Sequence, residues 1–333
     1  MKIQSSATGD RVIALPGLFL AALGVLAFSF TFPATVLALD GLDPYVIGVG
    51  RAGAAALPAA LSLAAARAAR PCRGQWAGLL FVALGVVFGF PVLSTLALGH
   101  GASAPHAAVV IGLLPAATAA LAVLRAGERP GRGFWTATAA GALCVCVFGA
   151  TRGAAGLAWA DLLLLGALLA GAVGYAEGGR LAREMPGWRV ICWALVLSGP
   201  LSVPMTLWLL VEGTPEWTGR ALMGFGYVSA VSMFVGFFAW YAGLGRAGIA
   251  RASQVQLAQP VLTVLWSVLL LGEHVDAGTW VAAAAVLVCV AWTQRARSGG
   301  PLCDVTPERT IGATVSYLRA RVGVVRGREA DRP

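Results

Sequence analysis

Polar side chains form one stripe in an otherwise apolar stretch near residue 256. Ser253, Gln256 and Gln259 are spaced by three residues, so a helix would place them on one face. An amide in hydrocarbon is costly unless it finds a partner or faces water. The stripe therefore fits either hydrogen bonding between helices or the lining of a polar pathway, and the sequence leaves both interpretations open.

Arg51 is a basic residue inside an apolar stretch. It lies about six residues from the nearer end of that stretch, or about 9 Å deep at about 1.5 Å per residue. Its guanidinium could reach outward to Asp40 or Asp43. It could instead face a cavity and hold an anionic group of a solute.

Other candidates for a solute pathway are polar or aromatic residues within apolar stretches, which could equally serve packing. They are Ser29, Thr31, Tyr175, Trp240, Tyr241 and Trp266. Because Trp240 and Tyr241 are adjacent, they point about 100° apart around a helix, and we expect only one to face a pathway. Pro115 and Pro260 each remove a backbone hydrogen bond, which permits a bend or hinge.

The residue types offer no reaction centre. The only lysine among 24 basic residues is Lys2, so neither a phosphate-binding P-loop nor a Schiff base is predicted. The six cysteines form no CxxC pair and the three histidines are scattered, so we predict no catalytic residue, no metal and no cofactor. Glu177 precedes Arg180 by three residues, which predicts a surface ion pair. We attribute the GxGxxG pattern at 48–53, like GxxxG at 85–89, to close helix packing.

The solvent of these residues is a lipid bilayer. Of 333 residues, 58% are apolar and 12% are charged, against about 45–50% and about 25% in soluble domains. This composition excludes a soluble enzyme or a nucleic-acid-binding module. Ten stretches are long enough to cross a bilayer. They lie at roughly 12–38, 45–66, 76–98, 105–124, 134–150, 158–179, 190–211, 219–243, 250–271 and 278–295.

The arginines predict the orientation of the chain. Nearly all of them fall in alternate loops and in the segment after residue 295, whereas the opposite loops contain only Arg152 and Arg220. Basic residues mark the cytoplasmic side of membrane proteins, so we expect both termini to be cytoplasmic. Tryptophans at the predicted ends of the spans agree with this frame.

An internal repeat is visible when the chain is shifted by 145 residues. Matched pairs include Pro115 with Pro260, Thr118 with Thr263, Gly127 with Gly272, Glu128 with Glu273, Trp135 with Trp280 and Cys144 with Cys289. Each copy contains five spans, so the second must enter the membrane in the opposite orientation. Inverted repeats of this kind are typical of secondary transporters.

The chain, with its two five-span copies, resembles the EamA domains of the drug/metabolite transporter superfamily. The resemblance rests on the segment from Pro260 to Glu273 (PVLTVLWSVLLLGE), on Phe237 to Ala242 (FFAWYA) and on Arg51. It covers residues 12–295 and is weaker in the first copy, where the third span lacks the usual aromatic pair. The resemblance implies a ten-helix metabolite exporter with a central cavity, and it does not transfer a substrate.

We therefore expect an all-α integral membrane protein of the cell membrane, with ten transmembrane helices in two inverted five-helix repeats. The first repeat covers residues 12–150 and the second 157–295, and 296–333 form a basic, flexible cytoplasmic tail. The predicted function is secondary-active export of a small, amino-acid-like metabolite by alternating access. The expected partners are this solute and membrane lipid, and no nucleic acid. The alternatives are efflux of lipophilic cations and, in another class, an intramembrane enzyme.

The first testable prediction concerns topology. Reporter fusions should place both termini and the 125–132 loop in the cytoplasm and the 272–277 loop outside, because the basic residues divide in that way. If the two loops that contain Glu128 and Glu273 lie on the same side, the inverted repeat is wrong.

Overall fold

Helices account for every element of the computed structural model. The structure describes residues 6–126, 131–152, 158–247, 252 and 255–298. In chain order, the elements are α1 (Ser6–Ser29), α2 (Thr31–Leu39), α3 (Pro44–Ala65), η1 (Arg73–Gln75), α4 (Trp76–Val82), η2 (Ala83–Gly89), α5 (Phe90–Gly99), α6 (Ala104–Ile111), α7 (Leu114–Ala126), α8 (Arg132–Arg152), α9 (Trp159–Leu181), α10 (Gly187–Glu212), α11 (Gly219–Gly226), η3 (Tyr227–Val235), α12 (Gly236–Ala247), α14 (Ala258–Leu271) and α15 (Ala277–Ser298). Within these ranges the all-α prediction is confirmed.

The helices have the length and composition of membrane spans. Seven helical segments of the described chain can cross a bilayer: Pro16–Leu39, Pro44–Ala65, Arg73–Gly99, Ala104–Leu121, Trp159–Leu181, Gly187–Glu212 and Gly219–Ala247. Ala258–Leu271 and Ala277–Thr293 are shorter apolar helices, and α8 covers the fifth predicted stretch. Large apolar side chains such as Leu57, Leu61 and Leu201 are exposed, as lipid-facing residues must be. The protein is a multi-pass membrane protein.

Prolines break two of the stretches, each of which the sequence predicts as one helix. Pro33 has no N–H for the carbonyl of Ser29, and the first stretch breaks between α1 and α2. Likewise, Pro115 cannot donate to Ile111, and the fourth breaks between α6 and α7. Each break divides one span into two helices, which can pack against different neighbours.

Two π-helical segments interrupt the third and eighth spans. They are η2 and η3, which lie 145 residues apart along the chain, the same shift that relates the two halves of the sequence. Their wider turns bring the N–H of Phe90 to the carbonyl of Gly85 and the N–H of Gly236 to that of Val231. In the third span Pro91 lies two residues after the segment and cannot donate to Val87, which accounts for the departure from α-helical bonding.

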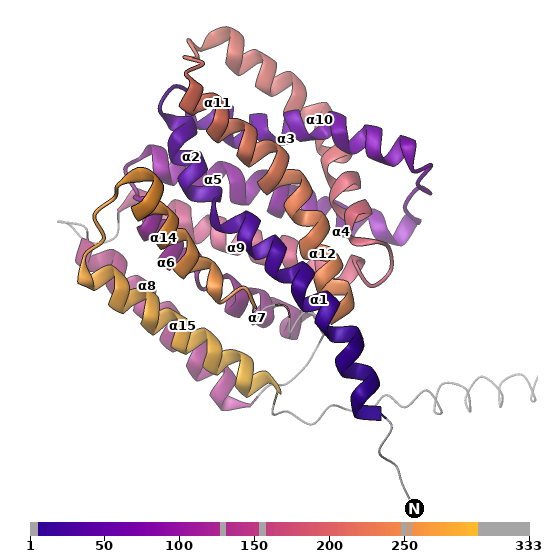
Figure 1. The fold of residues 1–333 in the computed structure, drawn as a ribbon, viewed down its shortest axis with the longest axis vertical. Coiled ribbons are helices and arrows are strands. Elements are labelled where there is room, and N and C mark those ends of the chain that lie inside the picture. Colours follow the sequence, from indigo (N-terminus) through magenta and orange to yellow (C-terminus); the bar gives the residue numbers. More distant parts are fainter. Residues whose placement is uncertain (1–5, 127–130, 153–157, 248–251, 253–254, 299–333) are drawn as a thin grey trace, which may run out of the picture. The chain divides into compact units, whose positions relative to one another are not determined.

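The helices pack in pairs from the two halves of the chain (Figure 1). α3 runs along α10, α1 along α12, and α8 along α15. α5 and η2 pack on α9, and α6 packs on α14. Most large interfaces are therefore formed between the halves rather than within one.

Glycines permit the closest of these approaches. A Cβ on Gly24 of α1 would lie 3.0 Å from the Cα of Trp240, and one on Gly243 of α12 would lie 2.8 Å from the Cα of Ala21. A Cβ on Gly48 would lie 2.9 Å from the Cα of Val92. Gly85 lies equally close to the backbone of α9. The close packing predicted at the glycine patterns of 48–53 and 85–89 is thus confirmed.

Replacing Gly24 tests this packing. Gly24→Ala should lower the thermal unfolding midpoint in detergent, because overpacking of a tight contact costs about 1–3 kcal/mol. Gly226→Ala is the matched control, since a Cβ there has no atom within 4 Å and alanine favours a helix over glycine. Equal midpoints for Gly24→Ala and the wild type would contradict the close approach of α1 and α12.

Candidate functional site

A cavity lies where helices of both halves meet, and we call it the central cavity. About 480 Å³ of space lies between its lining atoms, counted together with its opening. Aromatic rings dominate its wall, with a few polar groups among them. Its lining consists of Phe28, Thr31, Phe32, Arg51, Val86, Phe90, Pro91, Leu114, Tyr175, Ser232, Met233, Phe237 and Gln259.

Arg51 belongs to the lining of the central cavity. Its side chain is 1% exposed, and its Nε has no hydrogen-bond partner. Neither acidic residue predicted as a possible partner is engaged with it. Asp40 pairs with Arg220 at 2.7 Å, and Asp43 accepts a hydrogen bond from the N–H of Tyr45 at 2.7 Å. The sequence left two positions open for the Arg51 side chain, toward the acidic residues or toward a cavity. In the structure it faces the central cavity.

A hydroxyl pair joins the two halves at the cavity wall. The Oγ1 of Thr31 lies 2.7 Å from the Oγ of Ser232, which the π-helical turn of η3 brings to the cavity. The Oγ1 of Thr35 donates to the carbonyl of Thr31 at 2.7 Å. Thr31 is therefore both a lining residue, as predicted, and part of the contact that fixes α2 against η3.

Both hinge candidates line a smaller neighbouring cavity, which we call the proline cavity. It encloses about 250 Å³ and is lined by Phe32, Ala108, Ile111, Gly112, Pro115, Gln256, Gln259, Pro260 and Thr263. Gln259 and Phe32 belong to both cavities. The Oε1 of Gln259 is buried without a partner, and Gln256 is buried. The two glutamines thus lie on cavity walls, and helical structure is interrupted shortly before each proline, at residues 112–113 and 256–257. Ser253 lies outside the described residues.

Ser29 and Trp266 meet each other at the break of the first span and line neither cavity. The indole N–H of Trp266 donates to the Oγ of Ser29 at 2.9 Å, and the Oγ1 of Thr263 donates to the Ser29 carbonyl at 2.9 Å. That carbonyl is the one that Pro33 leaves without a helical partner. The depth of Trp266 in its span, unusual for tryptophan, follows from this contact.

Aromatic stacking completes the same junction. The rings of Phe30 and Trp266 are stacked with centroids 4.3 Å apart. The hydroxyl of Tyr227 donates to the carbonyl of Ala27 at 3.0 Å. Side chains of the eighth and ninth spans therefore hold the broken backbone of the first.

Of the remaining aromatic candidates, Tyr175 lines the central cavity, whereas Trp240 and Tyr241 do not. The ring of Trp240 packs on Tyr175 and Phe28, with centroids 5.6 and 6.2 Å apart. Tyr241 lies against Phe237. Neither Trp240 nor Tyr241 faces the cavity, since the adjacent positions on α12 point into the contacts with α1 and α9.

The sequence interpretation missed several residues. The rings of Phe28, Phe32, Phe90 and Phe237 form much of the cavity wall, but phenylalanine in an apolar span carries no signal of a site. A buried polar pair was also missed. The Nε2 of His106 lies 2.6 Å from the Oδ1 of Asp161, and the pair joins α6 to α9. Only the three-dimensional contact identifies it.

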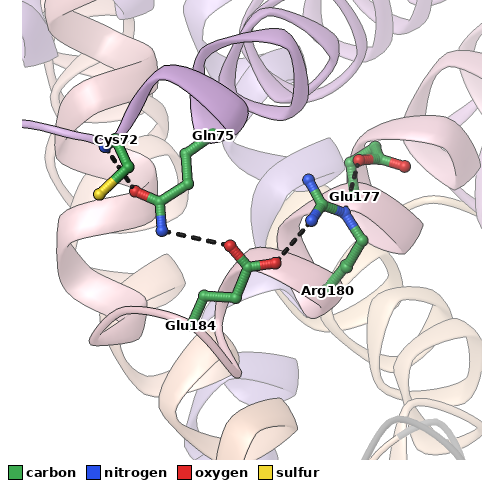
Figure 2. A network of polar contacts seen from close by, with 5 residues as sticks. All are labelled: Cys72, Gln75, Glu177, Arg180 and Glu184. Atoms are coloured by element: carbon green, nitrogen blue, oxygen red, sulfur yellow. Dashed lines mark hydrogen bonds and ion pairs between the residues drawn. The ribbon is translucent and has the colours of Figure 1, made fainter. Parts of the chain in front are cut away.

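Polar contacts tie the two halves together at one end of the bundle (Figure 2). Arg180 donates to Glu177 at 3.2 Å and to Glu184 at 2.6 Å, and Gln75 donates to Glu184 at 3.2 Å. The backbone N–H of Cys72 donates to the Oε1 of Gln75 at 3.0 Å. The predicted ion pair of Glu177 and Arg180 is present, but the carboxylate is 2% exposed rather than at the surface. We call these contacts the first tie.

A second tie joins other loops of the two halves. Arg220 pairs with Asp40 at 2.7 Å, and the N–H of Glu216 donates to the carbonyl of Gly41 at 2.8 Å. The second tie joins the loop after the first span to the segment that begins the eighth. The sixth and third spans are the counterparts of the first and eighth in the other half. The first tie joins the loop after the sixth span to the start of the third, so it corresponds to the second tie with the halves exchanged.

The junction of Ser29 and Trp266 can be tested by a double-mutant cycle. Ser29→Ala, Trp266→Phe and the double variant should reveal a coupling free energy of about 0.5–1.5 kcal/mol, because the indole N–H loses its acceptor. Unfolding in detergent measures it. The control cycle pairs Ser29→Ala with Trp292→Phe, whose indole is exposed on α15, and should be additive. Additivity in the first cycle would show that the hydrogen bond contributes nothing to stability.

Known proteins resemble this chain in sequence and in fold. The Uncharacterized transporter YdeK of Bacillus subtilis (strain 168) is 42% identical over 273 residues, which cover 82% of this chain and 95% of that protein. A protein of known crystal structure, 18% identical, shares the fold with a TM-score of 0.60 over 83% of this chain and 97% of its own.

A family model gives the assignment. The model of the EamA-like transporter family matches the chain twice, over residues 15–150 and 158–294. These matches include nearly all the described helices and every lining residue of the two cavities. The resemblance inferred from the segments at 237–242 and 260–273 is thereby confirmed. The chain belongs to the EamA-like transporter family.

Proposed function

We propose that this transporter moves a small metabolite out of the cell by alternating access, as a secondary-active carrier built from two inverted repeats. The observation that carries the proposal is the central cavity, whose wall is contributed by both halves of the chain. A site between two exchangeable halves can open to one side of the membrane and then to the other. Residues 12–150 and 157–295 are the proposed repeats, with five spans each.

The pairing of helices supports this division. Exchanging the two halves converts the contact of α1 with α12 into the contact of α9 with α5 and η2. The same exchange leaves three contacts unchanged, namely those of α3 with α10, α6 with α14 and α8 with α15. Equivalent residues also meet: the thiols of Cys144 and Cys289 contact each other, and they are 145 residues apart. A two-fold relation between the halves accounts for these pairings together.

The lining of the cavities supports the same relation. Leu114 and Gln259, which are 145 residues apart, both line the central cavity. Pro115 and Pro260 both line the proline cavity. Helical structure is interrupted shortly before each proline, at residues 112–113 and 256–257, so the two interruptions adjoin the site. We propose that these interruptions are the hinges about which the halves rock.

The ties fit an alternating cycle. Each joins the two halves through a corresponding pair of segments, and both are formed in the described conformation. We propose that the first tie must open for the cavity to reach the cytoplasm, and the second for it to reach the outside. This orientation follows the arginine distribution, with both termini and the basic tail of 296–333 in the cytoplasm and the protein in the cell membrane.

Efflux of lipophilic cations is the alternative within transport. The aromatic wall would suit such compounds, because cations bind ring faces. However, the described lining of the central cavity holds a guanidinium and no carboxylate. The electrostatics of the site therefore favour the metabolite exporter.

Transport in vesicles tests the proposal. Inside-out vesicles that contain the protein should accumulate a member of a metabolite panel, measured by mass spectrometry, and vesicles without it should not. Gln259→Ala should reduce this flux roughly two- to tenfold, since one hydrogen bond contributes about 0.5–1.5 kcal/mol. Gln256→Ala should act likewise, whereas Thr136→Ala, on the exposed face of α8, should not.

Thiol labelling separates a pathway from interhelical packing. Cysteine at position 256 or 259, in a background without the natural cysteines, should react with water-soluble thiol reagents during turnover. Absence of reaction in a fully active transporter would mean that this face is buried packing. Absence of flux for every metabolite in the panel would count against transport itself.

A further inference from the structure

Arg51 is a buried charge without a partner among the residues that the structure describes. No ion pair or hydrogen bond of its guanidinium is present among the described residues, and the side chain is 1% exposed. A buried cation costs several kcal/mol unless an anion or hydrogen-bond acceptors compensate it. The guanidinium lies instead at the wall of the central cavity.

The surroundings of Arg51 supply no anion that could serve it within the fold. Asp40 is occupied by Arg220, and Asp43 by the N–H of Tyr45. Among the described lining residues of the central cavity, the only other ionisable side chain is Tyr175. The cavity therefore carries an uncompensated positive charge that a solute can neutralise.

A second unmet group lies on the same wall. The Oε1 of Gln259 is a buried acceptor without a donor. Arg51 offers donors in a planar fork that matches a carboxylate, and Gln259 offers an acceptor. Phe28, Phe90 and Phe237 belong to the same lining and make much of it aromatic.

We propose that the transported solute is a small organic acid whose carboxylate binds the guanidinium of Arg51. An N–H or O–H group of the same molecule donates to Gln259, and its apolar part lies against the phenylalanine rings. This substrate class rests on the proposed transport function and narrows it. It excludes compounds whose only charge is positive.

Matched ligands test the assignment in the purified full-length protein. One set is phenylalanine, 3-phenylpropionate and phenethylamine, and a second is leucine, 4-methylpentanoate and isopentylamine. The acids and amino acids should raise the thermal unfolding midpoint at millimolar concentration, and the two amines should not. Leucine and phenylalanine should exceed their deaminated acids, because only they donate to Gln259.

Variants assign the effect to the guanidinium. Arg51→Gln should weaken carboxylate binding roughly 10- to 100-fold, with Arg51→Lys between it and the wild type, because lysine keeps the charge but loses the fork. Arg132→Gln is the matched control, since that arginine is exposed at the start of α8 and lines neither cavity. If Arg51→Gln does not fold, the comparison of acids with amines in the wild type and in Arg51→Lys decides the matter.

Several results would overturn the proposal. Equal stabilisation by the amines would do so, as would a carboxylate effect that persists in Arg51→Gln or its absence across both sets. Two further ligands distinguish other anions. If sodium chloride raises the thermal unfolding midpoint and no organic acid does, Arg51 binds an inorganic ion. If phosphatidylglycerol alone raises it, Arg51 binds a lipid headgroup. Arg51-independent flux of an amine in vesicles would leave transport intact and refute only the substrate class.

Discussion

A bilayer offers no water to a broken helix, so every backbone group that a break frees must find its partner within the protein. The break in the first span shows how the protein meets this requirement. Pro33 frees the carbonyl of Ser29, and Thr263 from the ninth span donates to it. The break turns Thr31 and Phe32 toward the central cavity. The cavity thus exists in this form because one half of the chain completes the backbone of the other.

The backbone of the molecule is duplicated, but the chemistry of its cavity is not. The same shift relates η2 to η3 and Pro115 to Pro260. By contrast, the amide of Gln259 corresponds to the apolar side chain of Leu114 in the other half. Equivalent scaffolds in the two halves therefore present different functional groups to the cavity, so that its lining is asymmetric.

Sequence reasoning predicted the all-α class and a multi-pass membrane protein, because hydrophobic length is a property of the chain itself, and its motifs predicted the family whose model matches twice. The ten spans and the inverted orientation of the second copy stay predictions. Sequence reasoning could not choose between the two positions of Arg51, because that choice depends on Asp40 being taken by Arg220. It also could not separate Trp266, which serves a junction, from Tyr175, which faces the cavity. Each is an aromatic residue in an apolar span, and only its neighbours across the bundle decide its role.

Charged contacts that face solvent form part of both ties, and this makes the ties sensitive to ionic strength. Arg220 and Asp40 are 61% and 40% exposed, and Arg180 and Glu184 of the first tie are 41% and 42% exposed. Mobile ions screen exposed pairs far more than buried ones, over about 10 Å at 0.1 M salt. Glu177 is the exception within the first tie, because its carboxylate is 2% exposed. Where the loops that form the two ties meet solutions of different ionic strength, the exposed pairs of one tie are therefore weakened more than those of the other.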